Sequence, residues 1–250
     1  MAPENYTPGY ASAIVDFMQR RSAETHAAFF TPLLRPGMRV LDCGCGPGAI
    51  TRGFAALVAP GEVVGADRED SQIETARRLN AGAGNLRFQA ASVYELPFDD
   101  ASFDAAFSHA LFEHLRDPLR ALAELKRVLK PDAMIGLRAP DWGGFLIHPL
   151  TPPIGDAVRW YRAHQESNGG NTQMGRALHA LLRQAGFARV RASASYEVYS
   201  DPQLIAGYLA LQADQLGESH HAESLRAWCR DPDAFFAQAW GEAIGFLGKR

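Results

Sequence analysis

The stretch Val-Leu-Asp-Cys-Gly-Cys-Gly-Pro-Gly-Ala-Ile-Thr, residues 40–51, decides the fold of this chain. An apolar strand ends at the carboxylate of Asp42, and the chain then turns through alternate glycines over residues 44–48 into a helix. Such a turn lets backbone N–H groups approach a ligand where a side chain would collide with it. A second predicted strand ends about 20 residues further on at Asp67, where a carboxylate can bind both ribose hydroxyls. The pattern predicts a cofactor that contains a nucleoside.

The charge of Asp42 separates two classes of cofactor. Gly44, Gly46 and Gly48 also fit the dinucleotide fingerprint, which makes an NAD(P)-dependent Rossmann oxidoreductase the first alternative. A dinucleotide would place its pyrophosphate beside Asp42, and like charges roughly 5 Å apart repel by about 3 kcal/mol at an effective dielectric of about 20. S-adenosylmethionine brings an ammonium and a sulfonium group, both of which a carboxylate attracts. The charge therefore favours S-adenosylmethionine as cofactor, with S-adenosylhomocysteine as its product.

Four segments follow one another in a recognisable order: the glycine turn, Gly-Ala-Asp at 65–67, Leu-Pro-Phe-Asp-Asp-Ala-Ser-Phe-Asp at 96–104 and Leu-Lys-Arg-Val-Leu-Lys-Pro at 125–131. Together they resemble the class I S-adenosylmethionine-dependent methyltransferases. The likeness is to the branch with the ubiquinone and menaquinone biosynthesis methyltransferases (methyltransferase domain 11). It is strong over 35–140 and weaker outside that range. It implies that the chain is an enzyme that transfers a methyl group.

The resemblance implies a residue-by-residue cofactor site. Asp42 and the glycines hold the methionine end, and Asp67 holds the ribose. The family often has an Asp before Val93 that accepts a hydrogen bond from adenine; this chain has Ser92, whose hydroxyl can still accept one. Arg68 stands where the family often has an apolar residue against adenine, and it either stacks there through its stem or is exposed. A second departure, Asp132-Ala133 in place of Gly-Gly, is interpreted as a loop variation.

Strand and helix patterns alternate from Met38 to Leu137. The predicted strands are 38–42, 63–67, 86–90, 103–108 and 134–139, and the predicted helices are 49–58, 70–80 and 117–129. This order predicts a Rossmann-like α/β fold with a mostly parallel, doubly wound sheet. Ligands bind beyond the carboxyl ends of such strands, where Asp42, Asp67, Ser92 and Ser108 lie, so Ser108 joins the predicted cofactor site.

We expect a single methyltransferase domain over 1–250. It comprises an N-terminal helical lid (1–33), a cofactor-binding core (34–140) and two cap segments (140–175 and 200–232). The first cap segment is predicted to be irregular with a helix at 154–164, followed by a helix at 172–185, a strand at 187–199 and helix over 202–230. The pattern at 235–247 allows either a last antiparallel strand or a helix.

The composition and charge of the chain limit which partners and which cellular location we expect for the protein. A net charge of −3 without a basic block predicts no nucleic-acid substrate, and no apolar run is long enough to span a membrane. The first residues lack a signal-peptide pattern, and the three cysteines suggest a reducing compartment, so we expect a cytoplasmic protein that is a monomer or a homodimer. A non-catalytic regulatory module that binds S-adenosylmethionine is the second alternative.

Methyl transfer requires positioning of the acceptor, and a base only where the acceptor must lose a proton. His109 and His114 follow the fourth strand as candidate general bases, or as polar residues satisfied in a turn. The His-x-x-x-Glu-His spacing is one residue longer than a known zinc pattern, so no metal is expected. Asp141 is the third candidate catalytic residue, because it follows the fifth strand and can orient an acceptor.

The resemblance suggests a small, planar acceptor from secondary metabolism, with O-, N- or C-methylation left open. Trp142 can stack on such an acceptor, or it is a buried anchor for the cap. Tyr161 and His164 are placed in the same pocket, and Tyr10 closes over it if the N-terminal helix is a lid. Arg21 is expected to be solvated, with a contact to the carboxylate of the cofactor as the alternative, and Trp240 is expected to lie in the core or at a subunit contact.

Overall fold

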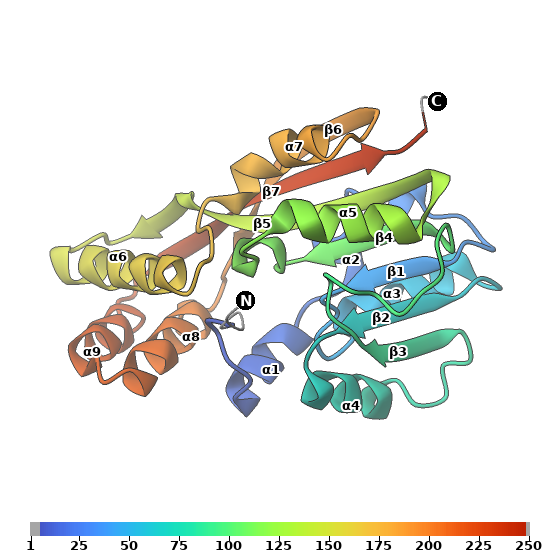
Figure 1. The fold of residues 1–250 in the computed structure, drawn as a ribbon. Coiled ribbons are helices and arrows are strands. Elements are labelled where there is room, and N and C mark those ends of the chain that lie inside the picture. Colours follow the sequence, from blue (N-terminus) through green and yellow to red (C-terminus); the bar gives the residue numbers. More distant parts are fainter. Residues whose placement is uncertain (1–5, 249–250) are drawn as a thin grey trace.

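A computed structural model describes residues 6–248, which form one seven-stranded sheet in the order β3-β2-β1-β4-β5-β7-β6 (Figure 1). The strands are β1 (Val40–Cys43), β2 (Val63–Asp67), β3 (Leu86–Ala90), β4 (Phe103–His109), β5 (Leu129–His148), β6 (Arg189–Val198) and β7 (Phe235–Phe246). Strands β1 to β5 are parallel, and β7 pairs antiparallel with both β5 and β6. The predicted Rossmann-like α/β fold is confirmed.

Helices cover both faces of this sheet. They are α1 (Ser12–Gln19), α2 (Ala23–His26), α3 (Ala49–Val58), α4 (Asp70–Leu79), α5 (Pro118–Val128), α6 (Pro152–Ser167), α7 (Met174–Gln184), α8 (Pro202–Gln215) and α9 (Ser219–Trp228), with short 3-10 turns η1 (Thr31–Leu33) and η2 (Phe112–His114). Helices α5 and α7 pack on one face, and α2 and α3 pack on the other. No helix within 6–248 combines the length and the apolar character that a membrane crossing needs.

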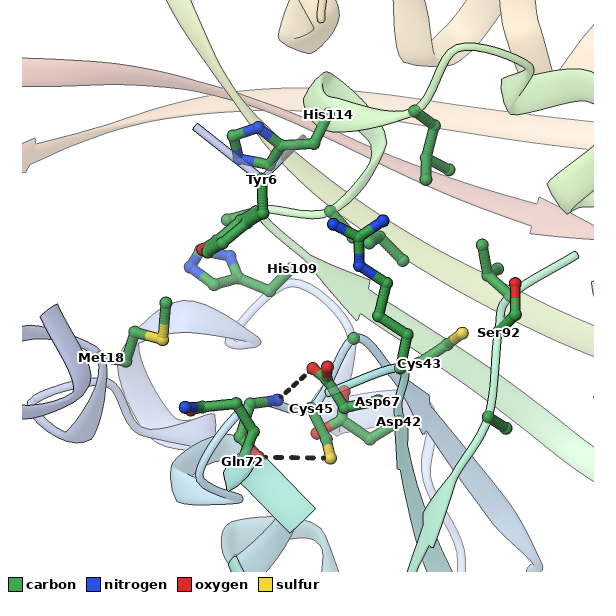
Figure 2. Close-up of a pocket in the computed structure, with 18 of the residues that line it drawn as sticks. Tyr6, Met18, Asp42, Cys43, Cys45, Asp67, Gln72, Ser92, His109 and His114 are labelled. Atoms are coloured by element: carbon green, nitrogen blue, oxygen red, sulfur yellow. Dashed lines mark hydrogen bonds between the residues drawn. The ribbon is translucent and has the colours of Figure 1, made fainter. Parts of the chain in front are cut away.

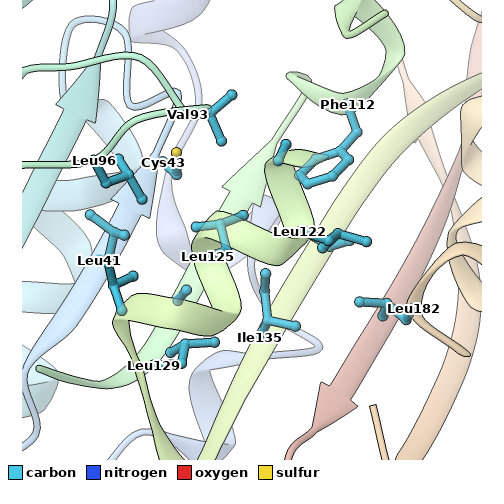
Figure 3. Packing of buried hydrophobic residues seen from close by; sticks show 14 of the residues in the cluster. Leu41, Cys43, Val93, Leu96, Phe112, Leu122, Leu125, Leu129, Ile135 and Leu182 are labelled. Carbon is cyan, nitrogen blue, oxygen red and sulfur yellow. The ribbon is translucent and has the colours of Figure 1, made fainter. Parts of the chain in front are cut away.

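The alternation of side chains along β1 explains how one short strand supports two cores. Successive side chains of a strand point to opposite faces. Leu41 joins the cluster under α5 and α7, where it lies with Leu125 and Ile135 (Figure 3). Its neighbour Val40 joins the cluster under α3 on the other face. Full burial of side chains of this size contributes about 1.5–3 kcal/mol each, so a strand of this pattern is held between the two helical layers.

A third apolar cluster lies at one end of the sheet and forms the cap. Helices α6, α8 and α9 pack against one another beside the extended ends of β5 and β7 (Figure 1). Trp142, Tyr161 and Phe236 are buried among them. The cap therefore stands next to the carboxyl end of β4, where a ligand is expected.

The expected irregular segment after residue 139 is wrong in one respect. Strand β5 continues to His148, because β7 pairs with its far part through Leu146, Ile147 and His148. The register shifts between Asp141 and Leu146, around the Gly143-Gly144 pair. Pro and Gly predicted a strand end, whereas the long-range pairing carries the strand through a bulge.

Strand β5 also begins at Leu129, earlier than predicted, so Asp132-Ala133 lie within this strand and not in a loop. The other predicted elements agree closely with the structure. Helix α3 and strands β2 and β3 have the predicted bounds. The helical stretch at 202–230 divides into α8 and α9 at Gly217, which has a φ of +77° and ends the first helix. The strand alternative for 235–247 is confirmed by β7. Residues 1–5 of the predicted lid lie outside the described residues, and the rest of it forms α1, α2 and η1.

Candidate functional site

The glycine turn between β1 and α3 is fixed to the end of β2. The N–H of Gly46 donates to Oδ2 of Asp67 at 2.9 Å, and the N–H of Glu69 donates to Oδ1 at 3.0 Å (Figure 2). Gly48 has a φ of +79°, and a Cβ at this position would lie 2.8 Å from Cε1 of Phe88. The turn therefore needs glycine for both backbone conformation and space, and Asp67 is held rigidly beside it.

Asp42 lies one residue before the end of β1 and has a buried carboxyl. Its side chain accepts the hydroxyl proton of Thr51 at 2.6 Å, and the residue is 2% exposed. Burial raises the pKa of Asp42 to about 7, against the opposing effect of the Thr51 hydrogen bond, and nearby Asp67 raises it further. The carboxyl is thus only partly ionised at neutral pH, and a cationic ligand would draw it toward the charged form.

A cavity of about 400 Å³ opens above this turn. Its lining includes these predicted cofactor residues: Asp42, Gly44, Gly46, Asp67, Arg68, Ser92 and Val93. Gly48 belongs to the turn but does not line the cavity, because it packs against Phe88. Ser108 does not reach the cavity: it lies on the opposite side of β4 from His109, with a buried Oγ that has no hydrogen-bond partner among residues 6–248. The prediction of Ser108 as a cofactor residue is corrected accordingly.

His109 and His114 stand at the other end of this cavity from Asp42 and Asp67 (Figure 2). Neither ring nitrogen of His109 has a hydrogen-bond partner in the described chain. Burial lowers the pKa of His109 well below 6.5, with Arg21 and Arg138 adding to the effect. Burial also lowers the pKa of His114 to about 3. Both imidazoles are therefore neutral at physiological pH.

A second, smaller cavity of about 60 Å³ adjoins the first. The two share these lining residues: Tyr6, Met18, Arg21, Ala110 and His114. The walls of the smaller cavity are aromatic and come from the cap, the N-terminal segment and β7: Tyr6, Phe17, Trp142, Tyr161, Tyr199, Tyr208 and Trp240. Trp142 and Tyr161 thus lie where the sequence placed them, at 5.0 Å between ring centroids.

The comparisons with known proteins agree with this geometry. Residues 41–137 match the methyltransferase domain family. An uncharacterized methyltransferase of Schizosaccharomyces pombe is 30% identical over 208 residues, which cover 79% of this chain and 74% of that protein. The chain belongs to the class I S-adenosylmethionine-dependent methyltransferases.

Three further proteins are similar to this methyltransferase in sequence or in fold. A ubiquinone/menaquinone biosynthesis C-methyltransferase of Ectopseudomonas mendocina is 46% identical over 105 residues, 39% of this chain and 40% of that one. The solved structure of the YcgJ protein from Bacillus subtilis has a TM-score of 0.65 at 20% identity, over 89% of this chain and 98% of that chain. The chain spans 51% of a probable methyltransferase of Aspergillus luteorubrus, to which it is 34% identical over 145 residues.

The cavity of the methyltransferase fits S-adenosylmethionine. The space at Gly46 is open, because a Cβ built there would have Met18 Sδ as its nearest neighbour at 3.6 Å. Each oxygen of Asp67 accepts one backbone N–H and keeps a second lone pair for a ribose hydroxyl. The Arg21 side chain has no hydrogen bond or ion pair with residues 6–248 and lines the same cavity, so it is available for a carboxylate.

Besides Gly48 and Ser108, two more predicted site residues of the methyltransferase lie outside both cavities. The carboxylate of Asp141 accepts Nε and Nη2 of Arg176 at 2.6 and 2.7 Å, as well as the N–H of Gly143. Burial alone would raise the pKa of Asp141, but the Arg176 hydrogen bonds outweigh it and lower that pKa. Asp141 is therefore a structural residue that fixes β5 to α7, contrary to the expected catalytic role.

The other misplaced residue is His164. Its ring stacks on Trp160 at 5.8 Å and lies 3.3 Å from Nδ2 of Asn168, on a side of α6 that borders neither cavity. Tyr10 does reach the site, but it lines the larger cavity and stacks on Tyr6 at 5.2 Å. It thus faces the cofactor end of the methyltransferase site rather than the acceptor end.

The sequence analysis does not place Glu113 and Trp240 in the site, and it gives Arg21 only as an alternative contact for the carboxylate of the cofactor. Arg21 follows α1, and no pattern showed that α1 crosses the cavity. Trp240 sits on β7 opposite Pro140, and this pairing turns one of its faces toward the cavity. Glu113 was considered only as part of a zinc pattern. The one signal that could have found it is an acidic residue directly beside His114 in an otherwise apolar stretch.

Proposed function

We propose that this methyltransferase transfers a methyl group to a small, planar organic acceptor. The observation that supports the proposal is the common wall between the cofactor cavity and the aromatic cavity. S-adenosylmethionine supplies, when bound, a methyl group on a positively charged sulfur that a nucleophile can displace in line. A planar acceptor between aromatic walls is held close to that methyl group, and positioning of this kind accounts for much of the acceleration in such displacements.

We assign the cofactor contacts as follows. Asp67 binds the ribose hydroxyls, and Asp42 attracts the positively charged end of the methionine moiety. Arg21 binds the carboxylate of that moiety. Ser92 accepts one backbone bond, from the N–H of Tyr94 at 3.2 Å, and keeps a lone pair for the adenine amino group. Val93 lies beside it and supplies its backbone to the adenine.

His109 is assigned to the acceptor end. His109 lines the cavity, neither of its ring nitrogens has a hydrogen-bond partner within residues 6–248, and its ring is fixed by a stack on Trp240 at 4.7 Å. Because burial and nearby cations keep its pKa low, His109 serves as a neutral hydrogen-bond partner and only as a weak base. His114 is fixed by an edge contact with Tyr6 at 4.8 Å and borders both cavities.

The names of the relatives differ in the kind of atom that receives the methyl group. Their names include a C-methyltransferase of quinone biosynthesis and, in Penicillium expansum, an O-methyltransferase. A quinone-like or phenolic natural product is planar, as the aromatic walls require. We also propose a cytoplasmic location, since all three cysteines are free thiols.

Calorimetric titration tests the proposal directly. We expect S-adenosylhomocysteine to bind at one site per chain and NAD not to bind. A crystal structure of that complex is expected to show the sulfur near the common wall. Binding of NAD without binding of S-adenosylhomocysteine would overturn the assignment. Absence of methyl transfer to every member of a broad panel of phenols, amines and quinols, with the cofactor tightly bound, would favour a regulatory role.

A further inference from the structure

Glu113 presents a buried carboxyl to the aromatic cavity. Its side chain is 3% exposed, and its Oε2 has no hydrogen-bond partner within residues 6–248. Its backbone carbonyl accepts the N–H of Asn171 at 2.8 Å and Nε2 of Gln165 at 3.3 Å. These bonds fix the residue in η2, so the carboxyl is held in place although one of its oxygens is unsatisfied. Buried polar atoms without partners are rare in folded proteins, and one that lines a cavity points to a ligand.

Within residues 6–248, no group that is positively charged at neutral pH forms an ion pair with this carboxyl. The titratable and charged groups that face it come from η2, the N-terminal segment, the end of α1, α6 and α8: His114, Tyr6, Arg21, Tyr161 and Tyr208. His114 Nε2 is 3.6 Å from Oε1, but the imidazole is neutral. The guanidinium of Arg21 lies beyond hydrogen-bond distance of the Glu113 carboxyl and acts on it only through its charge. Burial raises the pKa of Glu113 to about 8, which Arg21 partly opposes.

The size of the cavity restricts what can reach Glu113. Its volume is about 60 Å³, whereas an apolar protein cavity that holds one benzene molecule has about 150 Å³. A ring therefore does not fit inside it as a whole. The ring is accommodated at the wall shared with the cofactor cavity, between Tyr6, Met18 and His114, and only a polar substituent enters toward Glu113.

We propose that Glu113 anchors the acceptor through Oε2, and that the acceptor is an aromatic compound whose hydroxyl or amino group donates a hydrogen bond to it. This inference rests on the proposed function and adds to it the chemical class of the acceptor. A donor on the substituent satisfies the unpaired oxygen, and Tyr6, Met18 and His114 at the shared wall contact the ring. The bond to a carboxylate is stronger than the bond to a neutral acid, so the anchoring strengthens as Glu113 ionises.

The probes that test the anchoring are phenol, aniline and anisole. They share a ring, and anisole lacks the donor. Each is titrated by calorimetry into the protein saturated with S-adenosylhomocysteine. We expect phenol, aniline or both to bind about 10- to 100-fold more tightly than anisole, with an affinity that rises from pH 6.5 to 8.5. Which of the two binds more tightly distinguishes hydroxyl from amine acceptors. Equal affinities for all three probes, or no saturable binding of any, would overturn the inference.

Two variants separate anchoring from a structural role. In Glu113→Leu we expect the preference over anisole and its pH dependence to disappear, with unchanged binding of S-adenosylhomocysteine. Since Oε2 of the carboxyl has no partner within residues 6–248, the thermal midpoint is expected not to fall; a large drop would mean that Glu113 serves the fold instead. Glu113→Gln keeps an oxygen acceptor and is expected to retain part of the preference without the pH dependence.

The matched control is Glu166→Gln, an exposed carboxylate on α6 that binds Thr172 and lines neither cavity. It is expected to behave as the unmodified protein. If the unmodified protein fails to bind S-adenosylhomocysteine, the proposed function fails. If it binds the cofactor product but does not distinguish the probes, only the anchoring by Glu113 fails.

Discussion

Asp67 accepts the N–H of Gly46 at 2.9 Å, so the acid at the end of β2 also holds the glycine turn that follows β1. One carboxylate thereby fixes the relative position of the two loops that bind the cofactor. Burial raises the pKa of Asp67, and the backbone hydrogen bonds from Glu69 and Gly46 oppose this rise. A substitution at Asp67 thus has two separable consequences, loss of the ribose contact and release of the turn.

Two substitutions of Asp67 are expected to weaken cofactor binding to different extents. Asp67→Ala removes both the ribose contact and the bond to Gly46, and it is expected to cost about 1–3 kcal/mol of binding free energy for S-adenosylhomocysteine. Asp67→Asn keeps one oxygen for the Gly46 N–H and loses the charge, so a smaller cost is expected. Titration calorimetry measures both. Glu69→Gln, which alters a neighbouring carboxylate outside the cavity, is the control. Unchanged affinity in Asp67→Ala would show that the ribose binds elsewhere.

Asp42 makes the stability of the protein depend on pH. Its pKa is about 7 in the folded protein and about 3.8 when unfolded. The unfolded state releases this proton first, so the contribution of Asp42 to stability is fully present below about pH 4 and is lost as the pH rises through 7. Asp42→Asn, which can still accept the Thr51 hydroxyl proton, is expected to remove this slope. Urea unfolding at pH 5 and pH 8 measures how the free energy of unfolding changes with pH. An equal change in Asp42→Asn and in the unmodified protein would contradict the assigned pKa.

The same carboxyl links cofactor affinity to pH in the opposite direction. A ligand that carries an ammonium group binds best to ionised Asp42, so the affinity for S-adenosylhomocysteine is expected to rise between pH 6 and 8, with a limit of about tenfold per pH unit. The titration should be accompanied by proton release, which calorimetry in buffers of different ionisation enthalpy detects. Asp42→Asn should bind more weakly and without this pH dependence. A pH-independent affinity in the unmodified protein would show that Asp42 does not face the charged end.

The sequence predicted those parts of the site that lie within single β-α units. The turn after β1 and the acid after β2 are local, because each follows directly from where an apolar strand ends. The aromatic cavity is assembled from segments far apart in the chain. Trp240 reaches it only because β7 pairs with β5, and the bulge in β5 after Asp141 carries this carboxylate away to Arg176. Neither event leaves a local signal, so the sequence predicts the burial of Trp240 but not its place at the cavity, and it assigns Asp141 to the site.

Asp141 is expected to matter for stability and not for cofactor binding. Its carboxylate satisfies the N–H groups of Gly143 and Arg176, and Asp141→Ala leaves both without this partner. We expect a loss of about 1–3 kcal/mol in the free energy of unfolding, measured in urea. The exposed Arg176 side chain contributes little, since surface ion pairs are weak, so Arg176→Met is the milder control. A large loss of affinity for S-adenosylhomocysteine in Asp141→Ala would restore Asp141 to the site.

Arg21 allows the methionine end of the cofactor to be tested apart from the nucleoside. The Arg21 side chain has no partner in the part of the chain that the structure describes, and it lines the wall between the two cavities. If it binds the carboxylate, Arg21→Gln loses one charge-assisted bond, and the affinity for S-adenosylhomocysteine is expected to fall by about 1.5–3 kcal/mol. Methylthioadenosine, which lacks the amino-acid end, should bind the variant and the unmodified protein equally.

The comparison of these two ligands makes the test for Arg21 specific. A variant that distorts the cavity weakens both ligands, whereas loss of a carboxylate contact weakens only S-adenosylhomocysteine. Arg20→Gln, at the exposed neighbouring position, controls for the change in net charge. Because removal of Arg21 also takes away a cation that lowers the pKa of Glu113, the anchoring of phenol should shift to higher pH in the same variant. Equal weakening of both cofactor ligands, or none, would remove Arg21 from the cofactor site.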